Sequence, residues 1–172
     1  MSLPVEKPYT FAVVTMSDKG FRGEREDTSG AYLQKRLMAA GYQLVGYRVV
    51  PDTIAAIVAA TIEFADIGRA ALIVTTGGTG VAPTDVTPEA MLQVLDKEVP
   101  GMAEAMRAAS MLKTPRAALS RGKVGIRGSS LIINLPGSLK AAQENLEVLI
   151  PILDHALAKI QGDPDDCGQP HS

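Results

Sequence analysis

The chain of 172 residues has a single cysteine, two histidines and no tryptophan. With Cys167 alone, it can form neither an internal disulfide nor a cysteine-based zinc site. His155 falls outside the apolar stripe of the last predicted helix and His171 lies in the polar tail, so neither suits a serine or cysteine hydrolase triad. Carboxylates, a bound metal and backbone amides remain as carriers of chemistry, and these suit phosphoryl or nucleotidyl transfer better than acyl transfer.

The chain also lacks an excess of either charge and a long apolar run. Lysine plus arginine total 17 and aspartate plus glutamate 19, a net charge of −2 that shows no nucleic-acid footprint. No run of about 18 apolar residues is present, and residues 1–8 contain no apolar signal core. Hydrophobic residues make up 46%, enough for the core of one domain. We therefore expect a cytoplasmic protein with neither nucleic acid nor a membrane as partner.

The first half of the chain predicts strands that alternate with helices. The expected strands, which are short runs of β-branched or apolar residues, span residues 9–15, 43–50 and 70–75. Thr28 or Ser29 can cap the first helix, which Gly41 ends. Asp52 occupies an N-cap position before a second helix that ends at Gly68. The βαβαβ order predicts a three-layer α/β/α domain around a mostly parallel sheet.

The second half predicts further helices and a small hairpin. Thr87 is expected to cap a helix with Pro88 in its first turn, and another short helix is expected over residues 102–109. The last helix repeats apolar residues at spacings of three and four from Leu139 to Ile160. Strand-like pieces that flank Arg127-Gly128 predict a hairpin over residues 123–126 and 130–135. We expect an extension over residues 1–8, one domain over 9–161 and a flexible tail over 162–172.

The most informative segment is the sequence TTGGTGVAPTDVTPEA at residues 75–90. A buried strand ends in Gly-Gly-Thr-Gly, where backbone amides can approach an anion, and ligands of parallel sheets bind beyond such strand ends. Asp85 follows before the next helix. The loop is no Walker motif, which ends in Gly-Lys-Ser/Thr, and no dinucleotide fingerprint, whose third glycine would stand at Pro83. We predict an anion site; the alternative is a glycine-rich turn shaped only for packing.

Four other segments can carry binding or catalysis. In the loop after the first strand, Asp18 and Asp27 can hold a metal or a ribose. Lys19, Arg22 and Arg25 can meet phosphate oxygens, although a charged surface loop with a helix cap explains this segment as well. Asp52 is either a helix cap or a second carboxylate that shares Mg²⁺ with Asp85. Residues 134–138 either bind phosphate at a helix start or only cap that helix. A basic cluster is either a solvated hairpin or a phosphate site: Ser120-Arg121, Lys123 and Arg127.

The order of these motifs along the chain is similar to that of a known protein family. They run in order as Ser17-Asp18, Arg22-Gly23-Glu24, Glu26-Asp27-Thr28-Ser29-Gly30, Pro51-Asp52, Thr76-Gly77-Gly78-Thr79-Gly80, Asp85-Val86-Thr87-Pro88-Glu89, Pro100-Gly101 with Glu104, Leu119-Ser120-Arg121, and Asn134-Leu135-Pro136-Gly137. The order and residues resemble the MogA/MoaB family of molybdenum cofactor biosynthesis proteins, and most of all its molybdopterin adenylyltransferase branch. The glycine loop joined to Asp-x-Thr-Pro-Glu is the specific part of this resemblance.

The resemblance implies a fold, an assembly and a reaction. The fold is a three-layer α/β/α domain, the assembly a homotrimer, and a transient partner a molybdate-inserting enzyme. In the reaction, the phosphate of molybdopterin attacks the α-phosphate of ATP with Mg²⁺, which yields adenylylated molybdopterin and pyrophosphate. The resemblance implies a catalytic and metal-binding role for Asp52 and Asp85.

The resemblance also implies which residues bind each substrate. Those expected to bind molybdopterin and its phosphate are Thr76, Gly77, Gly78, Thr79, Gly80, Ser120, Asn134, Pro136, Gly137 and Ser138. Those expected to bind the nucleotide are Ser17, Asp18, Asp27, Ser29 and Glu104.

Two positions depart from the family pattern and keep two alternatives open. Thr84 stands where many relatives carry a basic residue, and Leu139 stands where the turn often continues with proline. These departures motivate a catalytically silent molybdopterin-binding carrier or assembly subunit. The other alternative is a nucleotide-processing hydrolase of the competence-damage type.

Overall fold

A six-stranded sheet forms the centre of the protein, whose computed structural model describes residues 9–164. The strands are β1 (Thr10–Met16), β2 (Gln43–Val50), β3 (Leu72–Thr76), β4 (Lys97–Glu98), β5 (Val124–Arg127) and β6 (Ser130–Leu135). They lie in the order β2-β1-β3-β6-β5-β4. Neighbours among β2, β1, β3 and β6 pair in parallel, whereas β5 pairs antiparallel with both β6 and β4. The predicted mostly parallel sheet with a hairpin excursion is confirmed.

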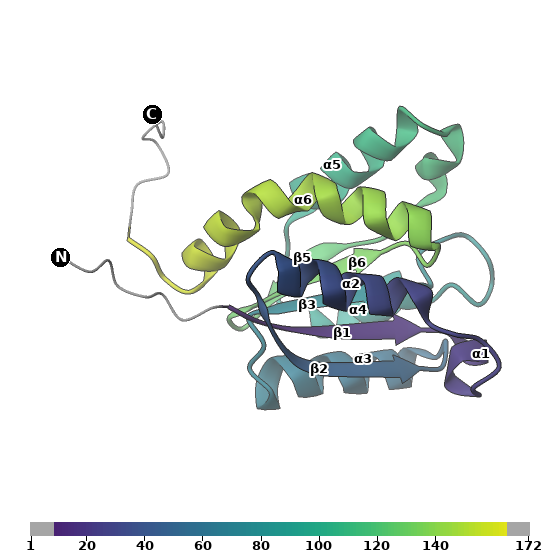
Figure 1. The fold of residues 1–172 in the computed structure, drawn as a ribbon, viewed down its shortest axis with the longest axis horizontal. Helices are drawn as coiled ribbons and strands as arrows, with labels where there is room; N and C mark the ends of the chain where they lie inside the picture. Colours follow the sequence, from purple (N-terminus) through teal and green to yellow (C-terminus); the bar gives the residue numbers. More distant parts are fainter. Residues whose placement is uncertain (1–8, 165–172) are drawn as a thin grey trace.

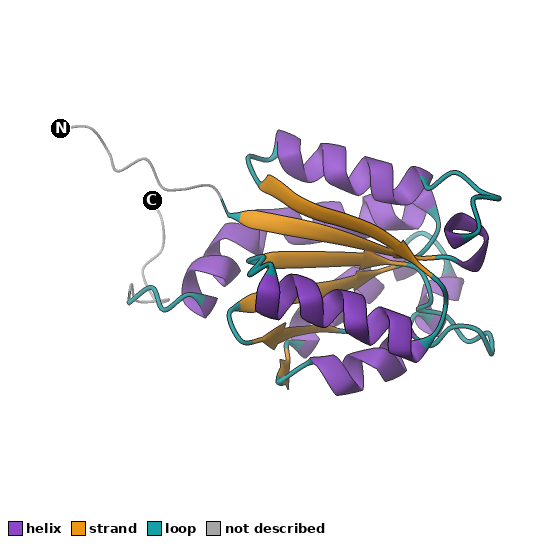
Figure 2. Cartoon of the chain, turned by 90° about the horizontal axis from the view of Figure 1, so that it is seen from below, coloured by secondary structure: helices purple, strands orange, loops and turns teal. Residues whose placement is uncertain are grey.

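Helices cover both faces of this sheet, so that the molecule has three layers (Figures 1 and 2). The helical segments are α1 (Asp18–Phe21), α2 (Thr28–Ala39), α3 (Ile54–Ile62) with the π-helix η1 (Glu63–Ile67), α4 (Thr87–Val94), α5 (Pro100–Met111), the 3-10 helix η2 (Pro115–Leu119) and α6 (Leu139–Ile160). Helices α2, α5 and α6 pack on one face, and α3, η1 and α4 pack on the other. None of the helices within residues 9–164 has the length and hydrophobicity needed to cross a membrane.

The two-sided core follows from the alternation of side chains along each strand. In β1, Phe11 and Val13 belong to the core on the side of α2, α5 and α6, whereas Ala12 and Val14 belong to the core on the side of α3 and α4. All four are fully buried. Because successive side chains of a strand point to opposite faces, a continuous apolar run is stable only where both faces are covered. The uniformly buried β3 shows the same pattern.

One expected loop contains a short helix, and three predicted helix caps are wrong by one residue or two. The loop after β1 contains the one-turn helix α1, because Ser17 Oγ accepts a hydrogen bond from Gly20 N. Asp27, rather than Thr28 or Ser29, caps α2, and Thr53, rather than Asp52, caps α3. In α4 the N-cap is Val86, and the hydroxyl of Thr87 donates to the carbonyl of Gly77 at 2.9 Å instead of capping the helix. Neighbouring Ser, Thr and Asp residues compete for such caps, and tertiary contacts decide among them.

The predicted long helix is confirmed from Leu139 to Ile160, and it runs on through Pro151. Ser138 caps it, as expected, by accepting from the amide of Ala141 at 3.3 Å. His155 is exposed on this helix, away from the core. Cys167, His171, the expected extension over residues 1–8 and most of the expected tail lie outside the described residues.

Candidate functional site

A cavity of about 610 Å³ opens at the carboxyl ends of the parallel strands, and we name it the central cavity. It lies where the chain order reverses, because β1 is flanked by β2 on one side and by β3 on the other. Ligands of open α/β sheets bind at such a switch point. Of the predicted site residues, those that line it are Ser17, Asp27, Ser29, Asp52, Thr76, Gly77, Gly78, Asp85, Gly137 and Ser138.

Two loops meet at the floor of this cavity: the glycine loop, residues 77–85, and the Leu-Pro-Gly turn, residues 135–137. A side chain on Gly77, whose φ is 106°, would come 2.5 Å from the carbonyl oxygen of Met16. One on Gly137 would come 3.2 Å from the Cα of Gly77. The hydroxyl of Thr76 donates to the carbonyl of Pro136 at 2.7 Å, and Gly77 N donates to that of Leu135 at 3.1 Å. The loops therefore pack backbone to backbone, which only glycine permits here.

Asp52 faces the central cavity from the end of β2, held by Asp18 from the end of β1. Asp18 N donates to Asp52 Oδ2 at 3.1 Å, and Asp52 N donates to Asp18 Oδ1 at 2.9 Å. Burial raises the pKa of the Asp52 carboxyl, and the negative charges of Asp18 and Asp85 add to the rise, while the Asp18 amide opposes it. The ionised form of Asp52 is therefore less stable in the folded protein than in water.

Asp85 closes the glycine loop with one carboxylate oxygen only. Its Oδ2 accepts from the amide of Ala82 at 2.9 Å, and its own amide donates to the Ala82 carbonyl at 2.9 Å. Its Oδ1 has no hydrogen-bond donor among residues 9–164. The side chain is half-buried at the cavity wall. One carboxylate oxygen of Asp85 is therefore available to a ligand.

Asp52 and Asp85 fit a partly hydrated cation. Within residues 9–164, no group of three or more His, Cys, Asp or Glu side chains is arranged as a complete metal site. Mg²⁺ needs no such cage, since it usually keeps several waters and binds one or two carboxylates plus substrate phosphates. The two carboxylates line one cavity, and their mutual repulsion is what a cation relieves.

Asp27 and Ser29 also line the central cavity, but the fold uses their polar groups. Asp27 Oδ2 accepts from the hydroxyls of Thr15 at 2.6 Å and Tyr47 at 2.5 Å, and Oδ1 accepts from the amide of Gly30 at 2.9 Å. The buried Ser29 donates to the carbonyl of Gly137 at 2.9 Å. Burial, together with the bond to Asp27, raises the pKa of the Tyr47 phenol. These two residues hold α2 against the strand ends and the Leu-Pro-Gly turn.

A second cavity, which we name the side cavity, measures about 270 Å³. The predicted molybdopterin-site residues that line it, rather than the central cavity, are Thr79, Gly80, Ser120 and Pro136. Its other walls come from α5, η2 and α6. The glycine loop and the Leu-Pro-Gly turn each contribute residues to both cavities. The residues predicted to bind molybdopterin, except Asn134, thus line two cavities rather than one.

Three predicted site residues line neither cavity: Asp18, which is bonded to Asp52, Glu104 and Asn134. Glu104 is exposed on α5 and lines neither. Asn134 is buried in β6, where Nδ2 donates to Thr75 Oγ1 at 3.0 Å and Oδ1 accepts from Lys123 N at 3.1 Å. The side chain of Asn134 therefore joins the strand β6 to the segment before β5.

Within residues 9–164, most of the predicted cations form ion pairs, and Lys19 and Arg25 do not. Lys123 pairs with Glu98, Arg127 with Asp66, Arg121 with Glu89, and Arg22 with Glu24. Arg25 lines the central cavity and forms no ion pair with any residue of the described chain. Sequence reasoning missed Tyr47, which only the pairing of β1 with β2 brings to Asp27, and the contacts of Arg121 with the glycine loop.

Comparisons with known proteins agree with this architecture. The family model described as "Probable molybdopterin binding domain" matches residues 12–155. Molybdopterin adenylyltransferase from Helicobacter pylori is 41% identical over 154 residues, which cover 87% of this chain and 86% of that protein. The molybdenum cofactor synthesis protein cinnamon from Drosophila melanogaster is 42% identical over 90% of this chain, which spans only 26% of that relative's length.

A solved structure gives the same result at the level of the fold. The molybdopterin biosynthesis enzyme MoaB from Thermus thermophilus superposes with a TM-score of 0.85 and 48% sequence identity. The match covers 91% of this chain and 98% of that one. The comparisons confirm the resemblance to the MogA/MoaB family and the three-layer fold expected from it.

Proposed function

This chain belongs to the family of probable molybdopterin binding domains, and from that premise we propose that it is a molybdopterin adenylyltransferase. It transfers AMP from ATP to the phosphate of molybdopterin and releases pyrophosphate. The observation that carries the proposal is the pair of carboxylates, Asp52 and Asp85, which line one cavity beside the glycine loop. The family and the names of relatives support the substrate, and the carboxylate pair supports the chemistry.

The reaction needs charge neutralisation more than a base. The phosphate of molybdopterin is largely ionised near pH 7, because the second pKa of a phosphate monoester is about 6. An oxygen of that phosphate bonds to the α-phosphorus of ATP, the bond from this phosphorus to the bridging oxygen breaks, and pyrophosphate leaves with the electron pair. Asp52 and Asp85 would hold Mg²⁺, which supplies positive charge to the phosphates when bound. Arg25 lines the same cavity, forms no ion pair within residues 9–164, and would pair with these phosphates.

The two cavities suit the two substrates. The central cavity is lined by carboxylates, hydroxyls and Arg25, and it suits ATP with its metal. The side cavity combines apolar residues, among them Leu119 and Pro136, with polar and charged ones, and it suits a flat pterin ring that carries polar groups at its edge. Its polar and charged residues include Arg107, Arg116, Ser120 and Glu144. The glycine loop, which lines both, is where the reacting phosphates meet.

An adenylylation assay tests the proposal. The protein is incubated with molybdopterin, ATP and Mg²⁺, and adenylylated molybdopterin and pyrophosphate are counted. We expect equal amounts of both, and no pyrophosphate when molybdopterin is omitted. Molybdopterin binding without pyrophosphate release would instead indicate a carrier or assembly subunit. Hydrolysis of a nucleotide without molybdopterin would indicate a hydrolase.

The assembly is a separate part of the proposal. We propose a homotrimer that passes its product, in a transient contact, to a molybdate-inserting enzyme. Light scattering on the purified chain tests the first point, with three times the mass of 18.1 kDa as the expected result.

A further inference from the structure

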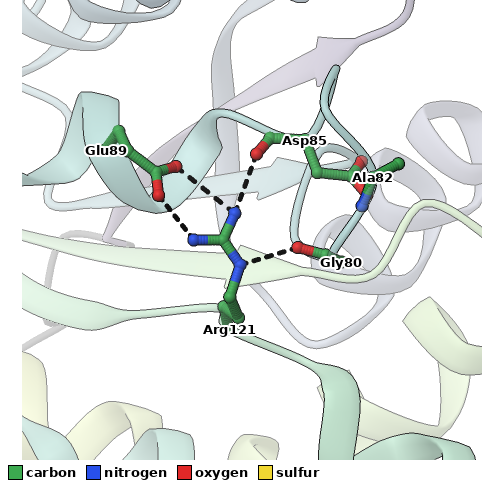
Figure 3. A network of polar contacts seen from close by, with 5 residues as sticks. All are labelled: Gly80, Ala82, Asp85, Glu89 and Arg121. Atoms are coloured by element: carbon green, nitrogen blue, oxygen red, sulfur yellow. Dashed lines mark hydrogen bonds and ion pairs between the residues drawn. The ribbon is translucent and has the colours of Figure 1, made fainter.

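Arg121 connects the segment after η2 to the glycine loop (Figure 3). Its Nε donates to the carbonyl of Gly80 at 2.7 Å, and Nη2 donates to the carbonyl of Asp85 at 2.8 Å. The guanidinium also pairs with Glu89 in the first turn of α4, and the Arg121 amide donates to the carbonyl of Thr79 at 2.7 Å. One side chain thereby holds the loop near its beginning and at its end.

The loop between these anchor points has few other restraints. Residues 81–84 are exposed. Apart from the contacts of Arg121, residues 80–85 are joined to one another by two hydrogen bonds, both between Ala82 and Asp85. The direction in which the Asp85 carboxylate points therefore depends on where the Asp85 carbonyl is held. A planar guanidinium with several fixed donors can hold two carbonyls and a carboxylate together, whereas a lysine ammonium offers no such fork.

We propose that Arg121 is a positioning residue for the reaction: it fixes the glycine loop so that the Asp85 carboxylate faces the central cavity. The inference rests on the proposed function, because it gives the contact of Arg121 with Asp85 a role in the reaction in which Asp85 would hold the metal. The neighbouring Ser120 lines the side cavity, so the same segment contributes to one cavity and holds a wall of the other. Arg121 acts through Asp85 and touches no reacting atom itself.

A purely structural role for Arg121 is the alternative, and the chain offers a matched control. Arg127 makes the same kinds of contact at the other end of α4: Nη1 donates to the carbonyl of Val94 at 3.0 Å, and the guanidinium pairs with Asp66 at 2.8 and 3.0 Å. Arg127 lines neither the central nor the side cavity. Replacing either arginine by lysine removes a fork of hydrogen bonds and keeps the charge.

The kinetic test compares Arg121→Lys with Arg127→Lys. We expect Arg121→Lys to lower kcat by about 10- to 100-fold with little change in the KM for ATP, because small displacements of catalytic groups have effects of that size. We expect Arg127→Lys to keep the wild-type kcat while its Tm falls as far as that of Arg121→Lys. An unchanged kcat in Arg121→Lys, or an equal loss of kcat in both variants, would overturn the proposal.

A second measurement needs no adenylylation activity. Hydrogen exchange of the amides in residues 80–85 should quicken in Arg121→Lys and stay unchanged in Arg127→Lys. If the wild type transfers no AMP, the proposed function fails, and exchange still reports on the loop. If exchange in residues 80–85 is the same in all three proteins, Arg121 does not hold the loop and the inference fails. Added guanidinium ion should also restore part of the kcat of Arg121→Ala, whereas methylammonium should not.

Discussion

The central cavity has acidic residues in two places, which we name its two rims: Asp27 on one, and Asp52 with Asp85 on the other. The carboxylates of the two rims differ in how many hydrogen bonds they accept. On one rim, Asp27 accepts three hydrogen bonds from the protein, so that both of its carboxylate oxygens are engaged. On the other rim, Asp52 and Asp85 each accept a single hydrogen bond from a backbone amide. All three follow strands in the sequence and were expected at the site. A carboxylate that can bind a ligand therefore differs from a structural one in having an oxygen that accepts no hydrogen bond from the protein. Its place at the edge of the cavity does not distinguish the two.

The largest effect is expected from Asp85→Asn. The side-chain oxygen of the introduced asparagine can still accept from Ala82 N, so we expect a Tm close to that of the wild type. The negative charge toward the cavity is lost, and we expect the rate of pyrophosphate release to fall about 100-fold or more, beyond the 10- to 100-fold typical of outer-shell changes. Thermal unfolding and the adenylylation assay measure the two effects. Wild-type turnover would remove Asp85 from the proposed chemistry.

The next effect is expected from Asp52→Asn, with activity and stability changing in opposite directions. We expect adenylylation to fall about 10- to 100-fold, less than in Asp85→Asn and within the range typical of changes around a metal site, because Asp85 remains. Because the folded-state pKa of Asp52 is raised, the wild type loses stability as pH rises from the ordinary aspartate pKa of about 3.9 through the folded value. Asp52→Asn removes this loss.

The pH dependence checks the sign of that effect. At pH 7 the Tm of Asp52→Asn should exceed that of the wild type, and the difference should shrink as pH falls toward the ordinary aspartate pKa. Thermal melts between pH 3 and pH 8 measure it, with Asp66→Asn as a control of opposite sign, because Arg127 lowers the pKa of Asp66. A wild type that is more stable than Asp52→Asn at pH 7 would contradict the assigned cause.

A smaller effect, on stability, is expected from Asp27→Ala. The change removes the cap of α2 and leaves the hydroxyls of Thr15 and Tyr47 without their acceptor. We expect unfolding free energy to fall by about 2 kcal/mol, with kcat of the folded protein near wild type. Urea unfolding and the adenylylation assay at low temperature measure both. A large loss of kcat at unchanged stability would place Asp27 with the other rim.

The smallest effect is expected from Tyr47→Phe. The variant removes one of the two hydroxyl donors to Asp27 and keeps the ring on β2. We expect a loss of about 1 kcal/mol in unfolding free energy, the usual net contribution of one hydrogen bond. In the Asp27→Ala background the same substitution should have almost no effect. Equal losses in both backgrounds would mean that Tyr47 acts independently of Asp27.

Much of this fold follows from local sequence, and the details that do not are long-range. The apolar runs predicted β1, β2 and β3 to within two residues, and the strand order explains why Asp52 and Asp85 meet at one edge. The helix caps were ambiguous, because Asp27 and Thr28, like Asp52 and Thr53, are adjacent polar residues that can each cap a helix. Because Thr53 caps α3, the Asp52 carboxylate is not used as a helix cap and keeps one oxygen for a ligand.

The distribution of the predicted molybdopterin residues over two cavities and the contacts of Arg121 lay beyond sequence reasoning for a different reason. They depend on how η2 and α5 pack beside the glycine loop, which no periodicity indicates. The sequence did place Arg121 in a basic cluster, with a solvated hairpin or phosphate as alternatives. The structure instead pairs it with Glu89 and two carbonyls.

The most direct test compares Asp85→Asn with Asp27→Ala in the adenylylation assay and in thermal unfolding. We predict that Asp85→Asn releases little pyrophosphate and keeps the wild-type Tm, whereas Asp27→Ala has a lower Tm and keeps the wild-type kcat. If both variants lost activity in proportion to stability, or if Asp85→Asn released pyrophosphate at the wild-type rate, the assignment of the two rims would be contradicted.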